Sequence, residues 1–188
     1  CLMTAQIANG GYKIKPHIIK DEFINYQDVI NKIKLDQFNF PLHERNYLDD
    51  INIEYYQRMY HKKSNINFVL DAMFGSTNEQ YGTSYRSRYD DPKYQFAGKT
   101  GTSQVRRITD LDRELDLDTE QIEYEKRDHA LYVAFAPYKD PRYAISVIIE
   151  HGGSGSKAAA PLASKLIKRI IDRHKLREQI NSGNSSLA

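Results

Sequence analysis

Four consecutive residues near the centre of the chain carry groups that could hold an anion beside a reacting carbonyl. Lys99 supplies an ammonium, Thr100 and Thr102 supply hydroxyls, and Gly101 leaves the backbone bare between them. The backbone amide of Thr102 can point into the same cleft. Together these groups form a receptor for a carboxylate next to a developing oxyanion. The alternative interpretation is a glycine-containing surface strand with an exposed lysine.

The residues on both sides of this tetrapeptide predict a β-strand. Tyr94 to Ala97 precede it and Ser103 to Val105 follow it, and both segments suit an extended backbone. Gly98 and Gly101 flank the lysine and leave no side-chain bulk where another backbone could lie close.

The segments upstream of this strand predict several shorter elements. In chain order they are the last turns of a helix at 1–9 stopped by Asn9-Gly10-Gly11, a short extended stretch at 12–20, an irregular strand pair at 21–40, a helical pattern over Leu48–Met59 that Pro41 precedes, a second helix through Phe68–Met73 closed by Gly75, and a polar loop at 76–94.

The segments downstream predict a hairpin and a covering helix. Residues 106–128 are rich in acidic side chains and predict an exposed excursion. His129–Ala136 and Arg142–Glu150 are apolar on both faces, which predicts two buried strands in an antiparallel hairpin. A helix that begins after Gly152–Gly155 should cover the sheet. Its expected apolar face contains Ala158, Leu162, Leu166 and Ile170, joined by Ala159, Ala163, Ile167 and Ile171.

These elements predict an α+β fold in which a C-terminal helix covers an antiparallel sheet of three late strands. Residues 1–178 are expected to form a partial domain and residues 179–188 a disordered tail. The 188 residues are 40% hydrophobic with a net charge of +2, which is too small to argue for nucleic acid or an anionic membrane. The chain begins at Cys1 without a basic leader or methionine, so we expect no signal peptide and a piece of something longer.

No cofactor and no metal site is expected. The alternating acidic residues at 110–118 resemble a calcium loop, but Leu115 and Gln121 stand where glycine and glutamate are needed. The six histidines are scattered without zinc-ligand spacing. Arg106-Arg107 is too small a basic spot for nucleic-acid recognition.

Beyond the Lys-Thr-Gly triplet, several blocks resemble class B penicillin-binding proteins, in particular the penicillin-binding protein 2 family of elongation-specific peptidoglycan transpeptidases. The order and rough spacing of the blocks match that family over residues 1–172, loosely across 20–65 and 106–126. The blocks are Ala5–Gly11 with Lys15–Ile18, Ala72–Gly75 with Asn78 and Gly82-Thr83, Arg127–Leu131, Ala134–Tyr138, and Glu150–Gly153.

The resemblance implies the C-terminal portion of a penicillin-binding protein transpeptidase or serine β-lactamase-like domain. In that family a serine attacks the D-Ala-D-Ala bond of a peptidoglycan stem peptide, and β-lactam antibiotics trap the acyl-enzyme. Lys99, Thr100 and Thr102 would hold the carboxylate of substrate or drug, and Gly101 would let it approach. The Thr102 amide would form half of the oxyanion hole. The family also implies an inner-membrane anchor, a periplasmic location, and work in the elongation machinery beside a lipid II polymerase.

The nucleophile that the resemblance requires is expected before Cys1, together with a Ser-x-Asn loop. Two segments match these motifs literally without the expected context. Ser154-Gly155-Ser156-Lys157 is better explained as a helix start capped by Ser154 or Ser156, and Ser76-Thr77-Asn78 as part of a loop. We therefore expect no catalysis from this chain alone.

Two other functions remain open at this point. A serine β-lactamase or D,D-carboxypeptidase would share the Lys-Thr-Gly strand. A non-catalytic module would instead use the sheet edge or the acidic segment to dock a partner.

Overall fold

The computed structural model describes residues 1–14, 16, 57–107 and 119–185. The chain divides into two compact units, Leu2–Asp71 and Ala72–Ala188, the second of which includes Cys1. The elements predicted at 21–40, most of the helical pattern predicted at 48–59 and the acidic pattern at 110–118 lie outside the described residues. The described end of that pattern, 57–59, is not helical as predicted, because Arg58 lies in a β-bridge. The predicted partial domain at 1–178 stays a prediction.

The first unit begins with the predicted helix end. Helix α1, Leu2–Ala8, stops at Asn9-Gly10-Gly11, where both glycines adopt the left-handed backbone (φ 92° and 91°). The Gly11 amide donates a 2.8 Å hydrogen bond back to the carbonyl of Gln6, which satisfies one of the free carbonyls at the helix end. Tyr12 then forms an antiparallel bridge with Arg58, in line with the predicted extended stretch.

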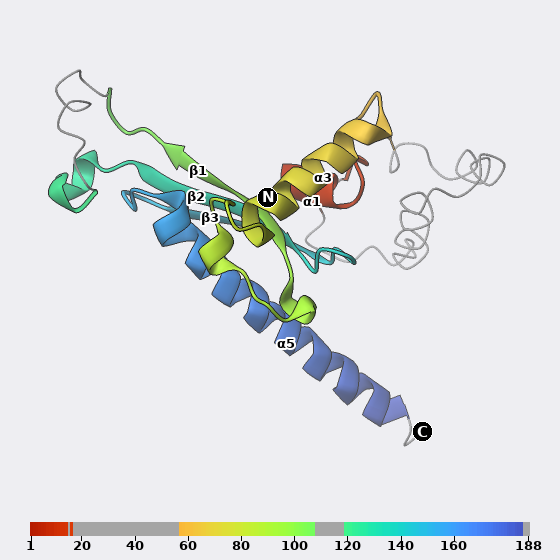
Figure 1. Ribbon diagram of the computed structural model, residues 1–188. Coiled ribbons are helices and arrows are strands. Elements are labelled where there is room, and N and C mark those ends of the chain that lie inside the picture. The colour runs from red at the N-terminus through yellow and green to blue at the C-terminus, as the bar shows by residue number, and fades with distance from the viewer. Residues whose placement is uncertain (15, 17–56, 108–118, 186–188) are drawn as a thin grey trace. The chain divides into compact units, whose positions relative to one another are not determined.

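The second unit is built on a three-stranded antiparallel sheet. Its strands are β1 (Ala97–Ser103), β2 (His129–Ala136) and β3 (Tyr143–Ile149), and they lie in the order β1-β2-β3 (Figure 1). The register pairs Gly101 with Leu131 and Leu131 with Ile148. The predicted Lys99 strand and the predicted hairpin are therefore both confirmed.

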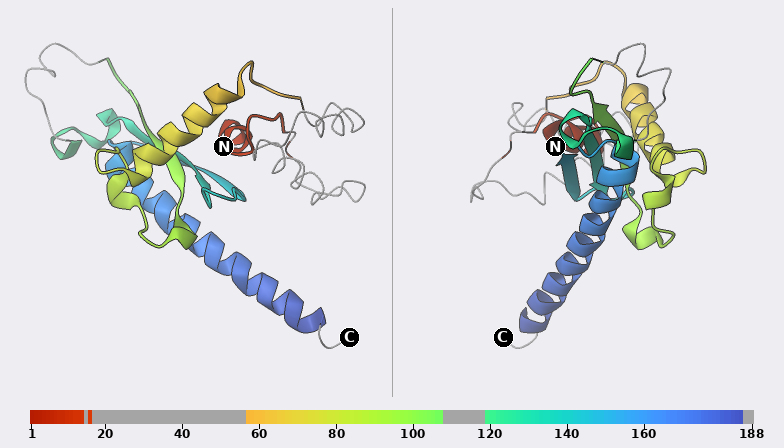
Figure 2. Two further views of the ribbon diagram at one scale, coloured as in Figure 1. Left: turned by 45° about the vertical axis from the view of Figure 1, so that its right-hand side comes forward. Right: turned by 90° about the vertical axis from the view of Figure 1, so that its left-hand side faces the viewer.

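One face of the sheet is covered by the C-terminal helix. A single π-helical turn, Gly155–Ala159, leads into α5, Ala160–Ser185, which crosses the sheet and projects beyond it in every view (Figures 1 and 2). The helix reaches into the segment that the sequence predicts as a tail. The core contains these buried residues: Phe96, Ala130, Tyr132, Ala134, Ala136, Val147, Ala159, Ala160, Ala163, Ile167 and Ile171.

The apolar stripe of α5 is narrower than the sequence predicts. Leu162 and Leu166 are 43% and 38% exposed, whereas Ala163 and Ile167 on the adjoining row are buried. Successive residues on a helix point about 100° apart, so Leu162 and Leu166 lie at the border of the face that Ala163 and Ile167 bury. The predicted face is therefore confirmed except at Leu162 and Leu166, which are exposed.

The opposite face of β3 is not buried as predicted. Val147, on the side of α5, is 8% exposed, but Ile148 on the other side is 63% exposed. Because α5 covers only one face, the expectation that β3 is buried on both faces is wrong.

The last helix before β1 is longer than expected. Helix α3, Lys63–Asn78, confirms the predicted helix but continues past Gly75 to Asn78, so the Ser76-Thr77-Asn78 segment is helical and not a loop. The Asn78 amide donates to the carbonyl of Phe74 (3.0 Å) inside the helix and to that of Phe96 (2.9 Å) just before β1. These two bonds stabilise the final turn and fix it to the start of β1.

Two short 3-10 turns interrupt the segment predicted as a polar loop between α3 and β1, Tyr85–Ser87 and Pro92–Tyr94. Two more, Thr119–Gln121 and Tyr124–Lys126, lie in the described part of the acidic excursion before β2.

Candidate active site

The structure places Lys99, Thr100, Gly101 and Thr102 together on β1, which is an edge strand of the described sheet. Lys99 and Thr102 are exposed, whereas Thr100 and Gly101 are half-buried. The free edge of an antiparallel strand presents every second backbone amide and carbonyl away from its partner. By this geometry β1 presents backbone groups at its free edge, and the exposed Lys99 and Thr102 add side-chain donors to the strand.

The Lys99 ammonium lies close to its neighbour. Its Nζ donates to the carbonyl of Thr100 at 2.8 Å and lies 3.4 Å from the Thr100 hydroxyl. An ammonium has three donors, so the group can bind an anion while it keeps the carbonyl contact. Lys99 thus brings a positive charge to the middle of the strand without an acidic side chain to neutralise it among its described partners.

Gly98 makes room for a side chain, and not for another backbone as the sequence suggested. A Cβ atom at this position would lie 2.3 Å from the hydroxyl oxygen of Tyr132. Tyr132 is fully buried and hydrogen-bonds Thr77 (3.1 Å) and Ser84 (3.0 Å), and burial raises the pKa of its hydroxyl. Tyr132 is the cross-strand partner of Thr100, and its buried side chain packs against β1 at Gly98 and so supports the strand.

The close approach of two backbones occurs at Gly101, but Gly155 is the residue that permits it. A Cβ atom on Gly155 would lie 2.4 Å from the Gly101 carbonyl oxygen and 2.5 Å from that of Leu131. A Cβ atom on Gly101 would meet only the Leu131 Cβ, at 3.3 Å. The π turn therefore rests directly on the backbone of the Lys-Thr-Gly strand.

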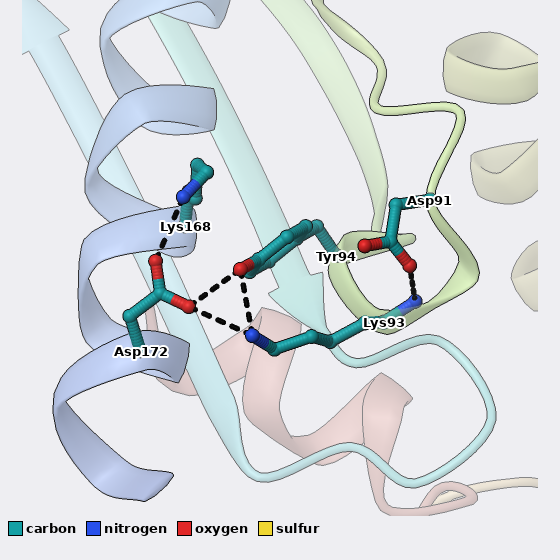
Figure 3. Close-up of polar contacts among 5 residues, drawn as sticks. All are labelled: Asp91, Lys93, Tyr94, Lys168 and Asp172. Carbon is teal, nitrogen blue, oxygen red and sulfur yellow. Dashed lines mark hydrogen bonds and ion pairs between the residues drawn. The ribbon is translucent and has the colours of Figure 1, made fainter. Parts of the chain in front are cut away.

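A polar cluster fastens the approach to β1 onto α5 (Figure 3). The Asp172 carboxylate on α5 accepts hydrogen bonds from Tyr94 (2.6 Å), Lys93 (3.0 Å) and Lys168 (2.8 Å). The bond from Lys168, then those from Tyr94 and Lys93, hold the pKa of Asp172 well below its usual range. Asp91 accepts from the Lys93 amide at 2.9 Å and closes the short turn before the strand. No sequence pattern singled out this cluster, because its members are far apart in the chain.

The Ser154-x-x-Lys157 segment does not form a nucleophile–base pair among the described residues. The Ser154 hydroxyl lies 3.0 Å from the Ser156 hydroxyl. Ser154 precedes the first turn, as predicted, and its carbonyl accepts from the Ala158 amide at 2.9 Å. Its side chain makes no capping bond, so the predicted capping role of that side chain is wrong.

Within the described ranges, no group of three or more histidine, cysteine, aspartate or glutamate side chains could hold a metal ion. None of the helices in those ranges is both long and apolar enough to cross a bilayer.

Residues 2–168 match the family model of the penicillin binding protein transpeptidase domain. The chain belongs to this family. Peptidoglycan D,D-transpeptidase MrdA of Salmonella typhimurium strain SL1344 is 40% identical over 104 residues, which are 55% of this chain and 16% of the relative. MrdA of Acinetobacter baumannii is 46% identical over 76 residues, 38% of this chain and 11% of the relative.

Among solved structures, PBP2 of Pseudomonas aeruginosa in complex with WCK 5153 shares the fold. It has a TM-score of 0.52 and 27% identity, and the match covers 88% of this chain and 27% of that one. The resemblance to the penicillin-binding protein 2 family and the predicted fold class are confirmed. The chain spans less than a fifth of the curated relatives it matches.

Proposed function

We propose that this chain is the C-terminal part of a penicillin-binding protein 2 type D,D-transpeptidase, and that β1 is the strand that binds the substrate carboxylate. The observation that carries the proposal is the exposed Lys99-Thr100-Gly101-Thr102 sequence on an edge strand, within a match to the transpeptidase family. The MrdA relatives are named peptidoglycan D,D-transpeptidases, which favours transpeptidation over a β-lactamase or carboxypeptidase activity.

In the proposed reaction a serine outside this chain attacks the carbonyl between the two D-alanines of a stem peptide. The terminal D-alanine leaves, and the acyl group passes to an amine on a neighbouring stem peptide. β-Lactam antibiotics would mimic the D-Ala-D-Ala end and remain attached to the serine. No metal or cofactor takes part in this scheme.

The residues of β1 would act on the two negative charges of this reaction. Lys99, Thr100 and Thr102 would donate to the terminal carboxylate, and a charge-assisted hydrogen bond of this kind contributes about 1.5 to 3 kcal/mol. Gly101 leaves space for the ligand. The Thr102 amide would donate to the oxyanion of the tetrahedral intermediate, with the amide of the serine as the second donor.

The family membership also supports a wider setting for the full-length protein. It would be held at the periplasmic face of the inner membrane by a segment outside this chain. It would work with the elongation machinery, including a lipid II polymerase, and it would not bind nucleic acid.

Intact-mass analysis after incubation with a penicillin tests the proposal. The full-length protein should gain one stable adduct on a serine outside this chain, and the 188-residue chain should gain none. An adduct on Ser154 would overturn the assignment of the nucleophile. Rapid release of hydrolysed penicillin would favour a β-lactamase, and a full-length protein that never reacts would favour a non-catalytic module.

A further inference from the structure

We propose that Thr83 is a positioning residue that directs the hydroxyl proton of Thr100 toward the bound carboxylate. The inference rests on the proposed function, since it assigns Thr83 a role in anion recognition by β1. It concerns a residue outside the Lys-Thr-Gly triplet, in the turn that follows α3.

Three hydroxyls form a row from α3 to β1. The Thr83 oxygen lies 3.1 Å from the Thr100 oxygen on one side and 3.1 Å from the Ser76 oxygen on the other. Thr83 is exposed, Ser76 and Thr100 are half-buried, and the row ends beside the Lys99 ammonium. The row therefore ends at Thr100, beside the positive charge that would attract an anionic ligand.

The turn that carries Thr83 is held firmly in place. A Cβ atom on Gly82 would lie 2.4 Å from the Ser76 carbonyl oxygen, so the turn packs directly on the end of α3. The next residue, Ser84, donates to that same carbonyl through its amide (2.9 Å) and its hydroxyl (3.0 Å). The Tyr132 hydroxyl also bonds Ser84 at 3.0 Å. These contacts fix the turn, and Thr83 with it, between the end of α3 and Tyr132.

The supply of hydroxyl protons in the row determines the direction in which its hydrogen bonds run. The Thr100 oxygen has one proton and two lone pairs, and the Lys99 ammonium can only donate to it. If Thr83 also donates, both lone pairs are occupied and the Thr100 proton is available to a ligand. If Thr83 accepts, that proton is used inside the row. A bound carboxylate is acceptor-only and selects the first arrangement, in which Ser76 donates to Thr83 and strengthens the row by polarisation.

This mechanism predicts that Thr83 affects carboxylate recognition and not folding or the acylation step in general. The test uses full-length protein with the substitutions Thr83→Val, which keeps the shape and removes the hydroxyl, and Thr83→Ser, which restores it. Acylation rate constants are measured with benzylpenicillin and with its methyl ester, which lacks the anionic carboxylate. Ser103→Ala, at the exposed end of β1, is the control for hydroxyl loss on the strand.

We expect Thr83→Val to slow acylation by benzylpenicillin about three- to tenfold, which corresponds to one lost hydrogen bond. Acylation by the ester should change by less than about twofold, and Thr83→Ser and Ser103→Ala should resemble the unmodified protein with both compounds. Equal slowing with acid and ester, or no slowing with either, would overturn the role of Thr83. An unmodified protein that does not react with benzylpenicillin would instead refute the proposed function itself.

Discussion

Substitution of Gly98 by alanine should destabilise the sheet through a clash with a single buried side chain. The added methyl would lie 2.3 Å from the Tyr132 hydroxyl oxygen, 2.5 Å from Cζ and 2.8 Å from Cε1. Tyr132 is fully buried and cannot move aside without leaving its hydrogen bonds to Thr77 and Ser84.

The magnitude follows from two contributions. Overpacking of a filled core typically costs about 1 to 3 kcal/mol. Displacement of the Tyr132 hydroxyl from its partners adds about 1 kcal/mol for each lost bond, although Thr77 and Ser84 can still bond each other at 3.3 Å. We therefore expect a loss of about 2 to 4 kcal/mol in the free energy of unfolding.

Gly101→Ala is the matched control on the same strand, because its methyl meets only the Leu131 Cβ at 3.3 Å. Alanine also reduces the entropy of the unfolded chain by about 0.4 to 1 kcal/mol, so this variant should be nearly neutral. Urea denaturation of both variants measures the difference. Addition of Tyr132→Phe should not rescue Gly98→Ala, because the ring carbon at 2.5 Å remains. Equal stabilities for Gly98→Ala and Gly101→Ala would refute the reasoning.

Two further predictions concern the supports of β1. Asp172→Asn should destabilise the protein at neutral pH, where the carboxylate is ionised in both states. Since the folded-state pKa of Asp172 is lowered, the stability it contributes is present above the unfolded pKa of about 3.9 and is lost as the pH falls below it. In thermal melts from pH 7 to pH 3, the melting temperatures of the variant and the unmodified protein should therefore approach each other only below about pH 4. A difference in melting temperature that does not change with pH would contradict this assignment. Gly155→Ala should place a methyl 2.4 Å from the Gly101 carbonyl oxygen, displace the Lys-Thr-Gly strand, and lower both melting temperature and penicillin acylation. Unchanged acylation in that variant would show that the π turn does not position the strand.

The fold was largely predictable where the signal is local. The strand at Lys99 and the β2–β3 hairpin follow from apolar runs and short connecting turns, and the end of α1 follows from Asn9-Gly10-Gly11. The width of the buried stripe on α5 was not predictable. It depends on how much of the helix surface the sheet and its neighbours cover, and no helical periodicity encodes that contact.

The sequence predicts the charged and polar residues of the candidate site, but not the residues that hold β1 in place. The Lys-Thr-Gly triplet carries its chemistry in consecutive residues, so it is visible in the sequence. The roles of Tyr132, Thr83 and Asp172 depend on contacts across 17 to 78 residues of chain. Such partners emerge only when the sheet register and the packing of α5 are known.

The most direct test of the account is the rate of penicillin acylation in full-length protein with Lys99→Ala. The account predicts a decrease of at least about tenfold, because the charge-assisted bond to the carboxylate is lost. Lys157→Ala, in the neighbouring Ser-x-x-Lys segment, should leave the rate within about twofold of the unmodified protein. An unchanged rate in Lys99→Ala, or an equal decrease in Lys157→Ala, would contradict the assignment of β1 as the carboxylate-binding strand.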